Sequence, residues 1–333
     1  TLQAQRAQWE SHWQELADYM LPRKADITKK RTEGDKRTEL LYDGTAVHAV
    51  ELLASSLHGM LTSPSTPWFA MRFRNPELQQ SDEANEWLET CIDQMYQAFH
   101  RSNFQQEIHE LYYDLVVFGT AAFYVEGADD GLRFSSRHIA EICISESPDG
   151  RVDTVYRKFK LTARAIAMQF GEENCPKEIK KDIENDPYKE HSIVHAVFPR
   201  TDTKGRSKKN KPIASVYYTA DTRQLLSESG FDEFPFMVTR FVKDSVSTYG
   251  RSPAMNALPD TKMLNKMSET TIRAAQKQID PPLMVPDDGF MLPVRTTPGA
   301  LNFYRSGTRD RLEPLQIGAN NPLGLNMEEQ RRN

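Results

Sequence analysis

Residues 253–279 form the segment whose pattern most limits what this chain can fold into. An α-helix turns by about 100° per residue, so four cations of this segment fall within about 60° of one another on one edge of a helix. These cations are Lys262, Lys266, Arg273 and Lys277. The opposite half carries the apolar residues Met263, Leu264, Met267, Ile272, Ala275 and Ile279. The pattern predicts one long amphipathic helix that buries its apolar half and presents a line of cations.

Proline marks both ends of this predicted helix. The chain enters it through the Gly-Arg-Ser-Pro sequence at 250–253, and Pro281 and Pro282 end it. Pro259 has no backbone N–H, so it either opens the main helix in its first turn or kinks it.

Composition and charge describe a polar chain without an overall basic field. The 333 residues suffice for two ordinary domains or for one elongated subunit with several modules. Hydrophobic residues make up 38% of the chain, a low share. Such a share is typical of a subunit that buries further surface against copies of itself, and equally of a soluble protein with many loops. The net charge is −5, so any contact with nucleic acid must come from local patches.

The cysteines and the hydropathy pattern indicate a compartment and exclude two classes of protein. Cys91, Cys143 and Cys175 lie far apart without metal-ligand spacing, which favours a reducing compartment over a disulfide framework. No run of about 18 apolar residues predicts a membrane span, and the first residues lack the apolar core of a signal peptide. We expect a soluble cytosolic chain with no membrane contact and no metal.

Hydrophobic periodicity divides the chain into a helical part, a β-rich part and the long helix. Helices are expected up to Met20, from Asp43 as N-cap to Leu61, and over 82–100 and 104–118. In the second of these helices Val47, Val50, Leu53, Ala54 and Leu57 are predicted to face inward, and a short strand is expected at the end of residues 62–73. Asn103 and Gln106 resemble a capping pair, and Gly119 is the predicted stop.

Alternation with a period of two begins at Thr120 and predicts successive hairpins up to Val242, interrupted by a helical insert at 162–184. After the long helix, residues 280–318 are rich in Pro and Gly and predict a small β-containing lobe. The last residues begin another helix, which suggests that the chain is cut from a longer one. The expected fold class is therefore α+β.

A search for catalytic motifs finds none, so no enzyme activity and no cofactor are expected. The chain has no phosphate-binding loop, no dinucleotide-binding fingerprint, no nucleophile elbow and no zinc-protease motif. His109 and Glu110 lack a second histidine four residues on, and His191 and His195 lie in a segment that alternates like a strand. Asp287 and Asp288 are typical turn residues.

Three basic sets remain as candidates for contact with a polyanion. The first is the helical line of four cations, which extends over about 22 Å at 1.5 Å per residue. The second is the loop at 200–211, and the third is Arg295, Arg305, Arg309 and Arg311 in the lobe. Each alternatively is a solvated surface, and the helical line alternatively pairs with acids of a neighbouring copy such as Glu269, Glu328 or Glu329.

The order of these parts, together with three stretches of sequence, resembles the portal proteins, the head-to-tail connector family of short-tailed phages. The stretches are 41–71 (LYDGTAVHAVELLASSLHGMLTSPSTPWFAM), 111–126 (LYYDLVVFGTAAFYVE) and 249–269 (YGRSPAMNALPDTKMLNKMSE). They are packing and turn patterns without a catalytic signature. The resemblance implies a wing (1–248), a first stem helix (249–279), a clip (280–318) and the start of a second stem helix (319–333), with further family segments after it.

The resemblance also implies a function and partners. Portal subunits form a ring, usually of twelve copies, at one capsid vertex, where terminase pumps double-stranded DNA through the ring and a tail adaptor docks afterwards. The resemblance further implies contacts with capsid and scaffolding proteins. It places the protein in the virion and, during assembly, in the host cytoplasm. The apolar half of the long helix would then contact neighbouring stem helices. The alternatives are another ring-forming tail or adaptor protein, and a nucleic-acid-processing enzyme with an unrecognised site.

Overall fold

The structure is a computed structural model that describes residues 2–29, 31–32, 34–128, 131–201, 211–279, 283–284 and 313–314. Its chain contacts divide it into two compact units. The first unit comprises Thr1–Leu40 and Ala46–Leu258, and the second comprises Leu41–Thr45 and Pro259–Asn333. The described residues combine helices and antiparallel sheets, so the expected mixture of α and β structure is confirmed.

The helical part of the first unit agrees with the periodicity of the sequence. Gly119 ends the last of its helices with a φ of 74°, the left-handed conformation that the sequence predicts for the stop. Asp43 accepts a hydrogen bond from the Thr45 N–H at 3.0 Å, in keeping with its predicted capping role. The elements are α1 (Leu2–Met20), η1 (Pro22–Lys24), α2 (Thr45–Leu61), α3 (Pro76–Gln79), α4 (Asp82–Arg101) and α5 (Phe104–Phe118).

Three details of this region were predicted wrongly. The Asn103 side chain does not cap α5; it exchanges hydrogen bonds with the Phe134 backbone, which supplies a better-fixed partner from the neighbouring strand. Residues 62–73 form no strand, because the Tyr96 hydroxyl bonds the backbone of Trp68 and Phe69 where a strand partner would be needed. In α2, Val50 and Ala54 are buried as expected, whereas Leu53 is exposed.

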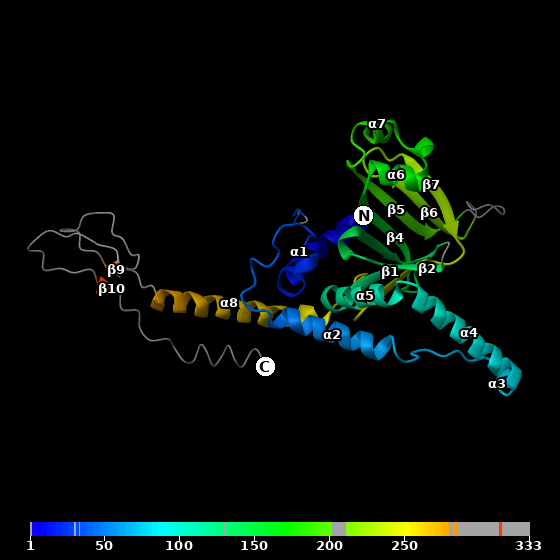
Figure 1. The fold of residues 1–333 in the computed structure, drawn as a ribbon, viewed down its shortest axis with the longest axis horizontal. Coiled ribbons are helices and arrows are strands. Elements are labelled where there is room, and N and C mark those ends of the chain that lie inside the picture. The colour runs from blue at the N-terminus through cyan, green and yellow to red at the C-terminus, as the bar shows by residue number, and fades with distance from the viewer. Residues whose placement is uncertain are drawn as a thin grey trace, which may run out of the picture. The chain divides into compact units, whose positions relative to one another are not determined.

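A three-stranded antiparallel sheet lies directly against α5 (Figure 1). Phe104 of α5 meets Phe123 and Phe134 of the sheet in an aromatic core, and Ala54 and Trp68 join it. The hairpin that the sequence predicts from Thr120 is confirmed as the first two strands. The sheet order is β2-β1-β8, with β1 (Thr120–Ala128), β2 (Gly131–Arg137) and β8 (Phe236–Arg240).

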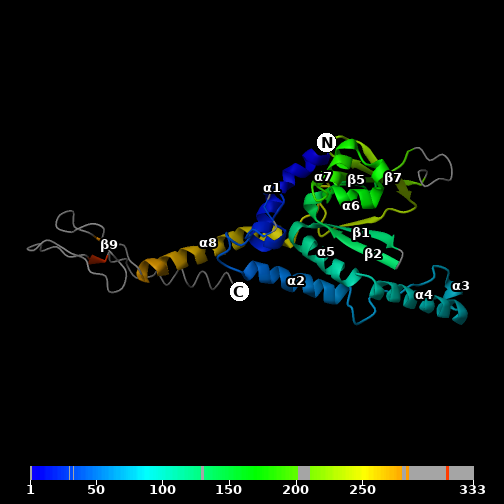
Figure 2. The same ribbon diagram turned by 45° about the horizontal axis from the view of Figure 1, so that its top comes forward.

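A five-stranded antiparallel meander forms the second sheet, and the helical insert packs on it (Figure 2). Ile166 and Ile179 of the insert pack with Ile193 and Leu226 of the sheet. The strands are β3 (Ile142–Glu146), β4 (Val152–Thr162), β5 (Glu190–Pro199), β6 (Ile213–Thr219) and β7 (Leu225–Phe231), and a short 3-10 turn, η2 (Ile139–Glu141), precedes them. The insert consists of α6 (Ala163–Phe170), η3 (Glu172–Asn174) and α7 (Lys177–Asn185).

The largest core joins α1, α5 and both sheets. Trp13 and Leu16 of α1 are fully buried in it, together with Phe118 of α5 and Val155 of β4. The first turns of the long helix contribute Met255 and further apolar residues to this core. The first unit therefore holds the start of the long helix rigidly.

The long helix is α8 (Pro253–Ile279), with Pro259 inside it. In the second unit the short strands β9 (Leu283–Met284) and β10 (Glu313–Pro314) pair antiparallel, which agrees with the expected β content of the lobe. Most of residues 280–318, all of 319–333 and the basic loop at 202–210 lie outside the described residues.

Candidate functional site on the long helix

The start of α8 is fixed by Ser252, a residue of the Gly-Arg-Ser-Pro sequence that enters the helix. Its buried hydroxyl accepts a hydrogen bond from the Met255 N–H at 3.2 Å and donates one to the Val117 carbonyl at 2.8 Å. This is the geometry of a helix N-cap, and Pro253 occupies the first helical position, where no N–H is needed. The cap ties the start of α8 to the end of α5.

The residues before the cap are held equally firmly. The Gly250 N–H donates to the Thr120 hydroxyl at 2.8 Å, and Arg251 exchanges two backbone hydrogen bonds with Val242. Tyr249 is buried, and its ring centre lies 5.0 Å from the Trp13 ring centre in a T-shaped contact. Because these contacts involve α1, β1 and Val242 just after β8, several elements of the first unit fix the segment that enters α8.

Pro259 lies at the seventh position of α8, so the structure places it inside the helix and past its first turn. Since proline has no N–H, the Met255 carbonyl receives no helix hydrogen bond from this position. The division between the two units falls between Leu258 and Pro259.

Within the second unit, Asn265 connects α8 to the segment that precedes α2. Its side-chain oxygen accepts hydrogen bonds from the Tyr42 N–H at 2.7 Å and the Asp43 N–H at 3.1 Å. Asn265 is buried, and so are Leu264 and Ser268 beside it. This set defines the face of α8 that is covered within the chain.

The four predicted cations lie beside this covered face, next to Glu269, which is buried as well. Lys262, Lys266, Arg273 and Lys277 are all exposed. At 1.5 Å per residue they extend over about 22 Å of a helix about 40 Å long. We refer to these four residues as the basic stripe.

Glu269 pairs with two cations of the basic stripe within the same helix. From the sequence, this pairing was expected, as one alternative, between neighbouring copies. Its carboxylate lies 2.8 Å from the Lys266 Nζ and 2.6 Å from an Arg273 guanidinium nitrogen. The pKa of Glu269 is lowered, chiefly by the hydrogen bond from Lys266, with a contribution from Arg273. The spacings of three and four residues are those of helical ion pairs, so the sequence contained the signal. Glu269 therefore offsets part of the positive charge of Lys266 and Arg273.

The six apolar candidates do not share one environment. Leu264 is buried within the chain, and Met267 and Ala275 are half-buried. Met263, Ile272 and Ile279 are 47%, 44% and 85% exposed. Ile272 and Ile279 continue the line of Leu264 toward the C-terminal end of α8, since 100° per residue brings all three within about 80°. They form an exposed apolar edge on the helix.

The remaining candidates give no second site of the expected kind. Arg295, Arg305, Arg309 and Arg311 lie outside the described residues. His191 contacts Asp182 at 3.1 Å on the helical insert, and His195 is buried on β5. Among the residues that the structure describes, no group of three or more His, Cys, Asp or Glu side chains has metal-binding geometry, and no helix is long and apolar enough to cross a membrane.

Comparison with known proteins supplies a family. The family model described as bacteriophage head to tail connecting protein matches residues 1–332. The chain is 31% identical over 309 residues to a probable portal protein of Bordetella phage BPP-1, and 32% identical over 310 residues to the portal protein of Salmonella phage epsilon15. Each alignment covers 91% of this chain and 56% of the relative, so the chain spans about half the length of the curated relatives that it matches.

Proposed function

The chain belongs to the bacteriophage head-to-tail connecting protein family, and from this membership we propose that it is a portal subunit. Copies of the whole protein form a ring at one capsid vertex, and double-stranded DNA passes through the ring during packaging and ejection. The two similar proteins bear the name portal protein, which supports the proposal. The proposed role is structural and requires no catalytic group.

The observation that carries the proposal is the division of α8 into unlike faces. One edge ends in the exposed apolar residues Ile272 and Ile279, and another carries the basic stripe. An isolated helix gains nothing by exposing isoleucine, whereas burial against a neighbouring copy removes apolar surface from water at about 25 cal/mol per Å². A ring brings copies of one helix side by side through a heterologous contact that closes by rotation. The apolar edge suits that contact.

The charge of the basic stripe suits a passage that DNA must slide through. Each phosphate that a protein neutralises adds affinity and salt dependence, so a conduit works best with few, loosely held contacts. Glu269 holds Lys266 and Arg273 at the helix surface and reduces the positive charge that the stripe presents. A net negative subunit with such a stripe, repeated around a ring, centres DNA without trapping it. No base-reading contact is needed for this role.

The partners follow from the proposed position in the virion. Terminase and then a tail adaptor dock on the clip (280–318), while capsid and scaffolding proteins contact the wing (1–248). In this assignment α8 is the first stem helix, and the ring has twelve copies. The protein is a component of the virion and assembles in the host cytoplasm.

Charge reversal on the full-length protein tests the DNA-facing assignment. The variant with Lys262, Lys266, Arg273 and Lys277 all changed to Glu is expected to form rings and to lose DNA packaging. A matched control changes four exposed cations outside α8 to Glu, namely Arg151, Arg164, Lys177 and Lys181, and should package normally. Ring formation is assessed by electron microscopy, and packaging is measured as the amount of DNA protected from nuclease. Normal packaging by the stripe variant would show that the stripe does not face DNA.

A further inference from the structure

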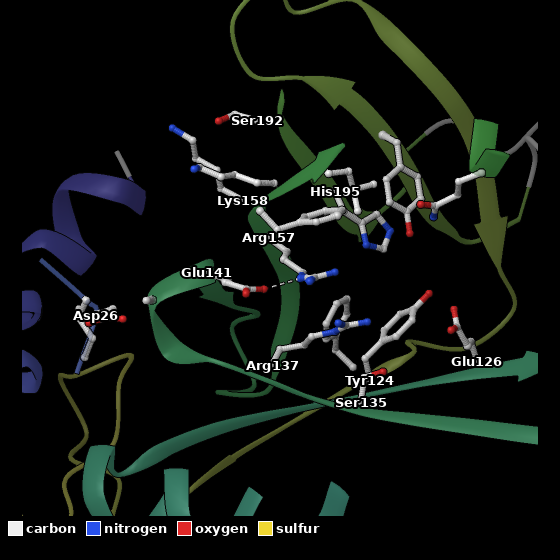
Figure 3. A pocket seen from close by; sticks show the side chains of 18 of the residues that line it. Asp26, Tyr124, Glu126, Ser135, Arg137, Glu141, Arg157, Lys158, Ser192 and His195 are labelled. Carbon is white, nitrogen blue, oxygen red and sulfur yellow. Dashed lines mark hydrogen bonds and ion pairs between the residues drawn. The ribbon is translucent and has the colours of Figure 1, made fainter. Parts of the chain in front are cut away.

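An open cavity of about 960 Å³ lies in the first unit between its two sheets (Figure 3). Strands β1 and β2 supply Tyr124 and Arg137 on one side, and β4 and β5 supply Arg157 and His195 on the other. Its size is at the upper end of the range typical of small-molecule sites. Neither the family nor the proposed portal function accounts for it.

Arg137 has an unusual position in this cavity. Its Nε is buried and has no hydrogen-bond partner among the described residues. Its guanidinium carbon lies 5.5 Å from the centre of the Tyr124 ring. Burying even one N–H donor of the arginine fork without an acceptor is costly. The side chain is therefore placed for an acceptor that the described residues do not provide.

Arg157 brings a second guanidinium group to the same space. Its Nε donates to the Glu141 carboxylate at 2.7 Å, and its guanidinium carbon lies 3.8 Å above the centre of the Phe159 ring. These contacts fix the group and leave its terminal nitrogens available. In Figure 3 the labelled Arg137 and Arg157 side chains extend into the cavity from its two sides.

The electrostatics of the cavity favour an anion. Burial lowers the pKa of Arg137, and the positive charge of Arg157 lowers it further. The same two arginines and, above all, burial lower the pKa of His195 to about 3, so the imidazole is neutral. Three carboxylates oppose this excess: Glu141 beside Arg157, the half-buried Glu126 on β1, and Asp26, which already pairs with Arg31 and Arg37. An entering anion would relieve the repulsion between the two guanidinium groups.

We propose that this cavity binds a phosphate-bearing anion between Arg137 and Arg157. The planar fork of Arg137 donates two parallel hydrogen bonds to phosphate oxygens, a geometry in which arginine exceeds lysine. The terminal nitrogens of Arg157 neutralise the same group from the opposite sheet. The anion thereby joins the three-stranded sheet to the five-stranded sheet.

The test is calorimetric titration of the full chain with pyrophosphate at constant ionic strength, with sodium chloride as the reference anion. The parent should bind one equivalent with a dissociation constant of about 1 mM or lower. Arg137→Gln removes the charge and the fork and should weaken binding about ten-fold or more. Arg151→Gln makes the same charge change on an exposed turn and should leave the constant unchanged.

A second variant separates a binding effect from a folding defect. Glu126→Gln removes a negative charge that faces the cavity, so it should strengthen pyrophosphate binding while the two arginines stay in place. Moreover, Arg137→Gln should melt no lower than the parent without ligand, because it removes a half-buried cation whose Nε lacks a hydrogen-bond partner among the described residues. At one fixed concentration, pyrophosphate should raise the melting temperature of the parent by more than that of Arg137→Gln.

Absence of pyrophosphate binding to the parent would overturn the proposal, and so would equal binding by parent and Arg137→Gln. A short single-stranded oligonucleotide added to the pyrophosphate complex then distinguishes the source of the phosphate. Displacement that depends on Arg137 identifies a nucleic-acid backbone, and no displacement identifies a small free anion. Both results retain a phosphate site between the two arginines.

Discussion

Replacing Gly119 with alanine probes how the first unit holds the start of α8. Gly119 ends α5 with a φ of 74°, in the left-handed region. An added Cβ would lie 2.6 Å from the Arg251 carbonyl carbon, 2.6 Å from the Gly250 oxygen and 2.8 Å from the Ser252 nitrogen. These are backbone atoms of the segment that enters α8, so no side-chain rotation relieves the contact.

The cost of Gly119→Ala has two separable parts. A left-handed alanine costs roughly 1–2 kcal/mol, and forcing a methyl group into a packed site costs roughly another 1–3 kcal/mol. We expect the free energy of unfolding to fall by about 2–5 kcal/mol in total. Gly131→Ala tests a positive φ without crowding, because Gly131 has a φ of 136° and nothing within 4 Å of the added Cβ. Gly127→Ala, with open space and no positive φ, should be close to neutral.

Urea unfolding followed by tryptophan fluorescence, at one fixed protein concentration, gives the comparison. Trp13 is fully buried in the core that the α8 entry segment joins, so the signal reports the affected region. The predicted order of destabilisation is Gly119→Ala, then Gly131→Ala, then Gly127→Ala. If Gly119→Ala costs no more than Gly131→Ala, the close packing of α5 against the α8 entry segment is refuted.

Two further predictions concern single side chains. Tyr96→Phe removes a hydroxyl that accepts hydrogen bonds from the Trp68 and Phe69 N–H groups. The free energy of unfolding should therefore fall by about 1–3 kcal/mol, seen as a lower urea midpoint. An unchanged midpoint would contradict the contact. For His195 the folded pKa of about 3 lies below the ordinary 6.5, so the unfolded chain takes up the proton first as the pH falls. The titration of His195 therefore does not change the free energy of unfolding above pH 6.5. Between pH 6.5 and pH 3 it lowers that free energy by about 1.4 kcal/mol for each pH unit. Urea unfolding of His195→Gln and of the parent from pH 6 to pH 4 tests this. The free energy of unfolding of the variant should fall by about 2–3 kcal/mol less than that of the parent. If the two free energies fall in parallel with pH, His195 protonates in the folded state.

Local signals made most helices and hairpins predictable. The period of 3.6 residues defines α1, α2, α4, α5 and α8 within a few residues of their observed ends, with a capping aspartate before α2 and a stop glycine after α5. The Asp-Asp-Gly sequence before β2 likewise marks a hairpin, because turn geometry is set by adjacent residues.

Contacts between distant residues were the part that sequence reasoning missed. Asn103 carries a good local capping signal, yet it bonds the Phe134 backbone 31 positions away. The facing of Arg137 and Arg157 requires two sheets to be placed together, which no periodicity encodes. Glu269 is different, since its pairing with Lys266 and Arg273 follows from helical spacing that the sequence displays.

Electron microscopy of the purified full-length protein tests the central claim most directly. A portal subunit should assemble into closed rings with a central channel, with the rings uniform in copy number. A protein that stays strictly monomeric under assembly conditions, across the concentrations used for microscopy, would contradict the proposed function.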